Sequence, residues 1–126
     1  MTSYKFRQGV VKVEELYGKM QEYLRMDTEI PYQEFNEYYK KVIDYLVSNF
    51  AKMEQEEKIK AKYILSIVES NSVARARRKG PEMKKHKKIQ EKTSFWSSAI
   101  IYNLTKAGMS QQEIDDAIQK LNQENE

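Results

Sequence analysis

Residues 31–50, PYQEFNEYYKKVIDYLVSNF, carry the clearest amphipathic pattern in the N-terminal half of this chain. Apolar side chains recur at helical spacing, and charged or amide side chains occupy the positions between them. The apolar stripe consists of Phe35, Tyr38 or Tyr39, Val42, Ile43, Leu46 and Phe50. Pro31 suits the first helical position, because its missing N–H would have no partner there. The stretch therefore predicts a helix from Pro31 to about Asn49.

Helical patterns continue on both sides of this stretch. A first helix is expected within residues 10–26, on a stripe of Val13, Leu16, Tyr17, Met20 and Leu24. A third helix should start near Ala51, and its apolar run YILSIV at 63–68 should lie in the core. Gly80 followed by Pro81 is a strong stop signal, and Gly80 suits the left-handed cap of the ending helix.

The C-terminal third predicts a weakly held helix and then two better ones. Residues 82–92 offer only Met83 and Ile89 as apolar anchors. The next helix should begin at Thr93 or Ser94, because their hydroxyl groups suit the capping position. Its apolar face should contain Trp96, Ala99, Ile100, Leu104 and Ala107.

A glycine and a capping box separate the last two helices. Gly108 should close the first of them. Ser110 and Glu113 then have the S-x-x-E spacing, in which each side chain satisfies a backbone N–H of the other residue. Ile114 and Leu121 belong to the apolar stripe of the helix that follows. Only four Gly and two Pro occur in a chain rich in helix formers, which argues against a sheet protein.

The sequence thus predicts an all-α fold: a single small helical domain of five or six helices, bundle-like, with a C-terminal helical hairpin. Within residues 1–126, three sub-units are suggested. They are the N-terminal helices at 1–72, a basic segment at 73–92 and the hairpin at 93–122.

Composition narrows the classes of function. Without Cys, the chain has no disulfides and no thiolate metal sites. No apolar run is long enough to cross a bilayer, and the N-terminus lacks a signal-peptide core, so a cytoplasmic protein is expected. Phosphate-binding glycine loops and nucleophile motifs are absent, and adjacent carboxylates on a helix face apart. We therefore expect no enzyme activity, no catalytic residues, no metal site and no cofactor.

Positive charge is concentrated in residues 75–92. This segment holds nine Lys and Arg against two Glu, a net charge of +7. Residues 1–74 hold 11 basic and 12 acidic groups, and residues 93–126 hold two basic and five acidic groups. A surface charged for solubility alone would mix the signs throughout. The nine cations are Arg75, Arg77, Arg78, Lys79, Lys84, Lys85, Lys87, Lys88 and Lys92.

Phosphate groups would relieve the repulsion within this segment. Arg suits bidentate phosphate contacts, and Lys supplies point charge. The favoured function is a small accessory or regulatory protein that binds DNA or RNA without sequence specificity and in a salt-dependent way. A solvated surface, a nuclear import signal or a docking site for an acidic protein would give the same charge run.

Three residues in or near the segment, two aromatic residues and one histidine, could be either binding residues or ordinary structural residues. Phe95 is a candidate base-stacking residue, whereas Trp96 is expected in the core. His86 is expected to be a lone histidine in solvent, since no metal-ligand pattern surrounds it. Residues 104–121 have a helix-turn-helix form, but Asp115 and Asp116 would face an anionic groove.

The alternative function is a protein-interaction module, such as an adaptor, regulator or inhibitor, that docks its basic segment on an acidic partner. Four tyrosines of the 31–50 stretch cannot all face one core, and exposed Tyr is enriched at interfaces. These candidate interface residues are Tyr32, Tyr38, Tyr39 and Tyr45. Long helices with a modest core also allow a homo-oligomer. Residue usage rich in Lys, Glu and Asn is typical of proteins encoded by AT-rich bacteria or their phages.

Overall fold

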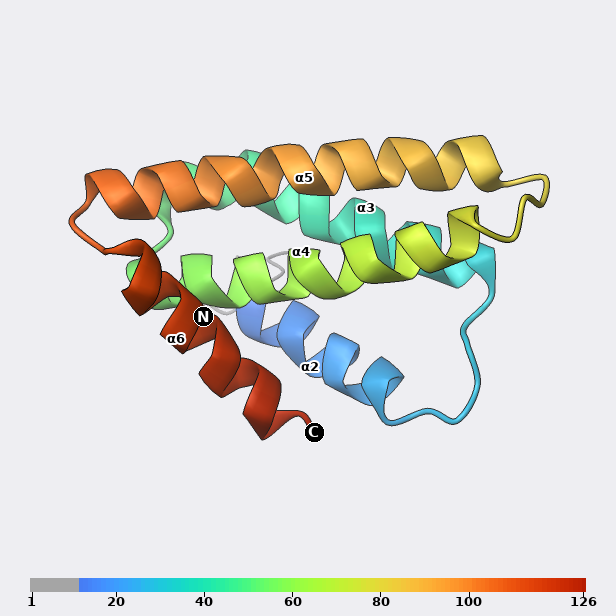
Figure 1. Ribbon diagram of the computed structural model, residues 1–126, viewed down its shortest axis with the longest axis horizontal. Helices are drawn as coiled ribbons and strands as arrows, with labels where there is room; N and C mark the ends of the chain where they lie inside the picture. Colours follow the sequence, from blue (N-terminus) through green and yellow to red (C-terminus); the bar gives the residue numbers. More distant parts are fainter. Residues whose placement is uncertain (1–11) are drawn as a thin grey trace, which may run out of the picture. The chain divides into compact units, whose positions relative to one another are not determined.

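The structure is a computed structural model that describes residues 12–126 (Figure 1). In this range the chain forms five α-helices, one short 3-10 helix and no strand, which confirms the expected all-α fold. The helices are α2 (Val13–Leu24), α3 (Tyr32–Asn49), η1 (Phe50–Lys52), α4 (Gln55–Ala76), α5 (Met83–Lys106) and α6 (Gln111–Glu124). Residues 10 and 11 of the first expected helix, and the N-terminus discussed for a signal peptide, lie outside the described residues.

Two compact units make up the chain, the first ending at Phe50 and the second running from Ala51 to Glu126. The basic segment therefore belongs to the second unit, together with α4, α5 and α6. Positions 72–73 and 92–93, suggested from the sequence as borders of sub-units, lie inside α4 and α5 respectively.

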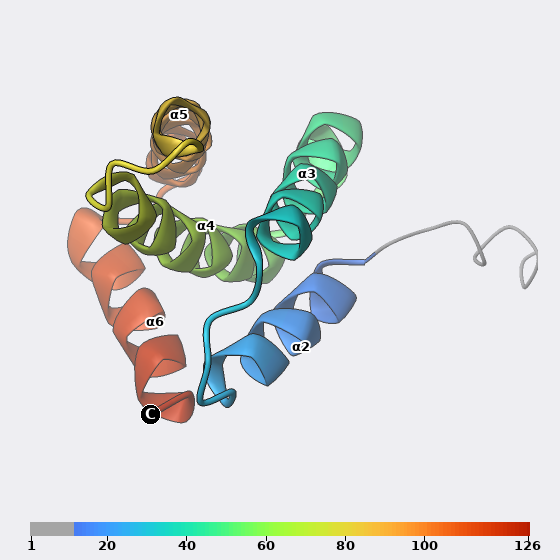
Figure 2. The same cartoon turned by 90° about the vertical axis from the view of Figure 1, so that its right-hand side faces the viewer.

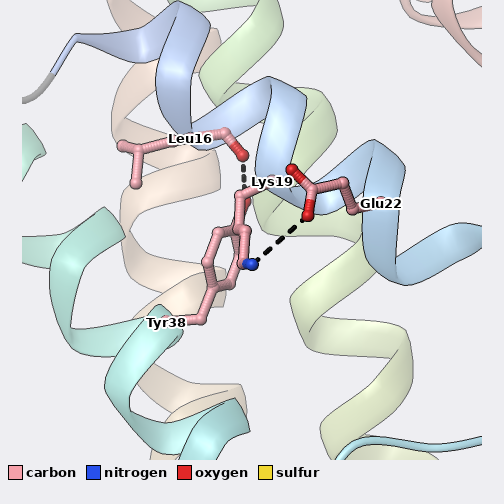
Figure 3. A network of polar contacts seen from close by, with 4 residues as sticks. All are labelled: Leu16, Lys19, Glu22 and Tyr38. Carbon is pink, nitrogen blue, oxygen red and sulfur yellow. Dashed lines mark hydrogen bonds and ion pairs between the residues drawn. The ribbon is translucent and has the colours of Figure 1, made fainter.

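The first unit contains α2 and α3. Both bury most of the stripe expected from the sequence, with Leu16 and Met20 on α2 and Phe35 and Leu46 on α3 among the buried residues. Leu24, expected on the α2 stripe, is exposed instead. The hydroxyl of Tyr38 on α3 donates a hydrogen bond to the backbone carbonyl of Leu16 on α2 at 2.6 Å (Figure 3). This bond fixes the two helices to one another at their buried side.

Pro31 corrects the expected start of α3. It is the N-cap, with φ −61° and ψ 157°, and the helix begins at Tyr32. The extended ψ places it one residue outside the helix, although its fixed φ would also suit the first turn.

In the second unit, α4 contacts both α5 and α6 (Figure 2). The expected apolar run of α4 is buried, as Tyr63, Ile64, Leu65 and Val68 show. On α6, Ile114 and Leu121 are buried. The buried residues of α5 recur every three or four positions, which is the spacing of one helix face. They are His86, Ile89, Thr93, Ser97, Ile100 and Leu104.

The break expected at Thr93 does not occur, because α5 is one helix of 24 residues. The Thr93 hydroxyl donates to the carbonyl oxygens of Ile89 and Gln90, at 2.9 and 3.0 Å, instead of capping a new helix. Thr93 lies on the buried stripe of α5, so the helix expected at 82–92 and the helix expected after it form one continuous helix. The first half of α5, which the sequence left weakly anchored, is thereby held in the same stripe as the second half.

The turn between α4 and α5 also differs from the expectation. Lys79, with φ 55°, adopts the left-handed conformation that was assigned to Gly80. Gly108 behaves as expected, with φ 109° directly after Ala107, the C-cap of α5. The capping box is confirmed too: the Ser110 hydroxyl accepts from the Glu113 N–H at 3.1 Å, and the Ser110 N–H donates to the Glu113 carboxylate at 2.8 Å.

Candidate nucleic-acid interface

Apart from Arg75, the cations of the basic segment lie on the α4–α5 turn and on the first half of α5. Eight of the nine are exposed. We call them the basic surface: Arg77, Arg78, Lys79, Lys84, Lys85, Lys87, Lys88 and Lys92. The turn positions the first three, because α4 ends at Ala76 and α5 begins at Met83. Lys84, Lys88 and Lys92 are four residues apart and form a row along one side of α5.

Arg75 does not belong to this surface. It is only 6% exposed and lies in the last turn of α4, where it continues the buried stripe of Val68 and Ser72. The sequence analysis included Arg75 among the candidate phosphate ligands because it is one of the nine cations of residues 75–92. Its helical position, three residues after Ser72, places it inside instead.

His86 is a second correction. It is 4% exposed, so the expectation of a lone histidine in solvent is wrong. Because α5 is continuous, position 86 falls on the same buried stripe as Ile89 and Thr93. The histidine is therefore part of the packing of the second unit and is not part of the basic surface.

Six of the eight cations of the basic surface form no ion pair with the described part of the chain. In the described residues, no carboxylate forms an ion pair with Arg77, Lys79, Lys84, Lys87, Lys88 or Lys92. The segment's own carboxylates, Glu82 and Glu91, do not pair with these six side chains either. The charge therefore remains available to an anion from outside the molecule.

The helix dipole of α5 adds to this positive field. Its first turn contains no acidic residue, and the N-cap residue Glu82 makes no side-chain capping hydrogen bond. Lysines near a helix N-terminus are unfavourable by about 0.3–1 kcal/mol each, since that end carries partial positive charge. Lys84 and Lys85 thus occupy positions that disfavour the isolated helix and favour an anionic ligand.

Phe95 lies on the outer side of α5 and is 64% exposed. It follows Lys88 by seven residues and Lys84 by eleven, so the three side chains share one helix face. Trp96 beside it is half-buried, and the two rings meet edge to face with centroids 5.7 Å apart. Trp96 thus supports one side of the Phe95 ring while leaving most of that ring accessible.

Tyr102 is a further exposed aromatic residue on this face, and the sequence reasoning missed it. It is 65% exposed and follows Phe95 by seven residues, or two helical turns. The Lys106 ammonium nitrogen lies 5.4 Å from the centre of its ring. The seven-residue spacing of Phe95 and Tyr102 is visible in the sequence, but spacing alone does not show that their shared face lies in solvent.

A shallow groove of about 570 Å³, largely open to solvent, includes Phe95 in its lining. Glu69 of α4 lines one wall, and residues of α5 line the other. The α5 residues are Gln90, Glu91, Ser94, Phe95 and Ser98. The groove thus offers amide, hydroxyl and carboxylate groups next to an aromatic ring.

The four tyrosines proposed as a protein interface are mostly enclosed. Tyr38 and Tyr45 are buried, and Tyr32 and Tyr39 are half-buried. Burial raises the pKa of Tyr38 and, with the nearby Tyr32, that of Tyr39. Together they present little surface to a partner.

A second cleft, of about 630 Å³, lies in the first unit between α2 and α3. Its charged lining is mixed, with Lys19 and Lys41 against three glutamates. Burial and a hydrogen bond with Glu34 raise the pKa of Tyr23 in its wall to about 12. Lys19 is already engaged, since it pairs with Glu22 at 3.3 Å (Figure 3) and lies over the Tyr23 ring.

The described residues form neither a metal site nor a membrane-spanning helix. Within residues 12–126, no group of three or more His, Cys, Asp or Glu side chains could hold a metal ion. Across the same residues, every helix is too short or too polar to cross a membrane.

No family model matches the chain, and no curated protein or solved structure proves similar to it. A function must therefore be inferred from the chemistry of its own residues.

Proposed function

We propose that the protein is a small, non-enzymatic nucleic-acid-binding protein whose basic surface contacts phosphate groups. One observation carries the proposal. Six exposed cations between Arg77 and Lys92 form no ion pair with the described carboxylates of the chain. A polyanion would neutralise all of them at once and release its condensed counter-ions, which is the main driving force of sequence-independent binding.

The spacing of the lysines suits a linear polyanion. Lys84, Lys88 and Lys92 are each displaced by about 6 Å along the axis of α5. The cations of the α4–α5 turn extend the same charged region past the N-terminus of the helix. A phosphate chain that follows this row can contact several cations in succession, whereas a single small anion can contact only one or two.

Low sequence specificity is expected. The helix α6, which follows the Gly108 turn, has an acidic exposed face with Asp115 and Asp116. Glutamine amides can pair with adenine, but those of Gln111 and Gln112 donate to these two carboxylates at 2.9 and 2.8 Å. A helix with this surface would be repelled by the phosphates at the edges of a groove.

The test compares two charge-matched variants by fluorescence polarisation. The first, Lys84→Glu with Lys88→Glu, reverses two charges of the basic surface. The control, Lys40→Glu with Lys120→Glu, changes the net charge equally at exposed positions elsewhere. Labelled DNA and RNA oligonucleotides, both duplex and single-stranded, are titrated at about 50 mM and about 200 mM salt.

Wild-type protein should bind at low salt and weaken strongly at high salt. The first variant should bind at least about tenfold more weakly than the control at low salt. Circular dichroism establishes that both variants keep their helices. Absence of binding at low salt contradicts the proposal, and so does an equal loss in the two variants. If these lysines instead retain an acidic protein and no nucleic acid in a pull-down from the native host, the protein-interaction alternative replaces it.

A further inference from the structure

We infer that the preferred nucleic acid is single-stranded and that its bases stack on Phe95 and Tyr102 along the outer face of α5. This inference rests on the proposed function and adds the class of nucleic acid and the contacts that select it. Its basis is the position of two exposed aromatic rings on the same helix face as the lysine row.

The outer face of α5 alternates charge and aromatic rings. Phe95 follows Lys88 by two turns, Tyr102 follows Phe95 by two turns, and Lys106 follows Tyr102 by about one turn. The buried stripe that begins at His86 and ends at Leu104 occupies the other side of the helix. In the view along α5 in Figure 2, α4 lies on one side of this helix. From Lys84 to Lys106 the face extends about 33 Å, which is long enough for several nucleotides.

Stacking on these rings discriminates against a duplex. Bases of a single strand can leave their neighbours and stack on an aromatic side chain, and this contact tolerates any base. Bases in a duplex are already stacked and paired, so their faces are not accessible to Phe95 or Tyr102. A duplex would therefore use only the cations of the basic surface, whereas a single strand would use both sets of contacts.

The surroundings of Phe95 set the orientation of the strand. Lys88 and Lys92 lie on one flank of the ring, and the groove lined by Glu69 and Glu91 lies on the other. Carboxylates repel phosphates, so the backbone should follow the lysine flank. A base on Phe95 would then point its edge toward the groove, where the serine hydroxyls and the Gln90 amide can donate or accept hydrogen bonds.

Tyr102 offers a second stacking position about 10 Å further along the axis. The Lys106 ammonium now lies near its ring. An exposed contact between a cation and an aromatic ring is weaker than the stacking of a base, so a base can take its place. Lys106 would then be close enough to contact the phosphate of the stacked nucleotide.

The experiment uses the full chain and the variant Phe95→Ala with Tyr102→Ala. The probes are a labelled oligodeoxythymidylate of about 20 nucleotides and a DNA hairpin with a duplex of matched phosphate number. Wild type should prefer the single strand by about tenfold or more. The variant should lose about 30-fold or more of its single-strand affinity and keep its duplex affinity. The conservative variant Phe95→Trp with Tyr102→Phe should retain the preference.

Trp96 gives an independent readout, because it is the only tryptophan of the chain and its ring is 5.7 Å from that of Phe95. Its fluorescence should change when the oligodeoxythymidylate binds and remain constant with the hairpin.

The outcomes separate the two claims. If neither probe binds at low salt, the proposed function fails. If both bind equally, or if the alanine variant keeps its single-strand affinity, the proposed function stands and the inference is wrong. Equal loss of both affinities by the alanine variant, with its helicity intact, also overturns the inference.

Discussion

At the scale of single residues, Tyr38 shows how one hydroxyl group fixes two helices. Its ring is buried in the first unit, and its hydroxyl donates to the Leu16 carbonyl at 2.6 Å. The ring also meets Tyr23 edge to face at 5.4 Å. A buried phenol hydroxyl without a hydrogen-bond acceptor would destabilise the fold. The hydrogen bond to Leu16 therefore allows a tyrosine to be buried at position 38.

We expect Tyr38→Phe to lower the free energy of unfolding by about 1 kcal/mol, because the ring packing remains and one buried hydrogen bond is lost. Chemical denaturation followed by circular dichroism measures this change. Tyr102→Phe is the control, since its ring lies mostly in solvent and should change stability very little. Equal effects of the two substitutions would show that the Leu16 bond contributes nothing.

Tyr23 supplies a prediction about pH. Burial and the hydrogen bond with Glu34, with further contributions from Glu22 and Glu37, raise its pKa from 10.0 to about 12. The folded chain thus holds the phenol proton more tightly than the unfolded chain. The resulting stability is complete below pH 10 and is lost as the pH rises from 10 to about 12.

Glu34→Gln should lower the pKa of Tyr23, because it removes a negative charge that opposes the phenolate. Ultraviolet titration of tyrosine ionisation, compared with the same titration of Tyr23→Phe, identifies the residue. An unchanged Tyr23 transition in Glu34→Gln would show that Glu34 does not contribute to the raised pKa.

At the scale of elements, periodicity located the helices but not every boundary. The apolar stripes of α2, α3 and α6 were evident because each has a polar face to contrast with. Thr93 misled the prediction, because a threonine hydroxyl can either cap a new helix or bond back within one, and only burial decides. Arg75 and His86 were placed in solvent by their residue type, whereas the continuation of α4 and α5 put both on buried faces.

The capping box gives the prediction at this scale. Ser110→Ala should lower the free energy of unfolding by about 0.5–2 kcal/mol, since the Glu113 N–H loses its side-chain acceptor. Ser70→Ala on α4 is the matched control, because that serine is exposed within a helix and alanine is the better helix former. Thermal denaturation of both variants checks the difference. A similar change in the two would contradict the capping role.

At the scale of the whole molecule, the sequence predicted which charges gather and could not predict which faces they share. The net charge of +7 follows from the order of residues 75–92 alone, and eight of the nine cations are exposed. The aromatic residues were harder to assign. Phe95 was recognised because it adjoins the basic segment, but the lysine row joins the face of Phe95 and Tyr102 only because α5 continues through Thr93 without a break.

If the proposed function holds, the salt dependence of binding counts the phosphates that the basic surface contacts. For a single strand the logarithm of the affinity falls with the logarithm of the salt concentration, with a slope of about −0.7 per neutralised phosphate. If the six cations without an intramolecular ion pair each neutralise one phosphate, the slope should be about −4.

Lys84→Glu with Lys88→Glu removes two of these contacts. The slope should then become shallower, at about −3 or closer to zero. Lys40→Glu with Lys120→Glu should keep the wild-type slope, because counter-ion release depends on contacts and not on net charge. Phe95→Ala with Tyr102→Ala should also keep it, since stacking releases no counter-ions. Polarisation titrations at four or more salt concentrations give all four slopes. A common decrease in both charge variants would mean that the strand senses the molecule's total charge and does not lie along α5.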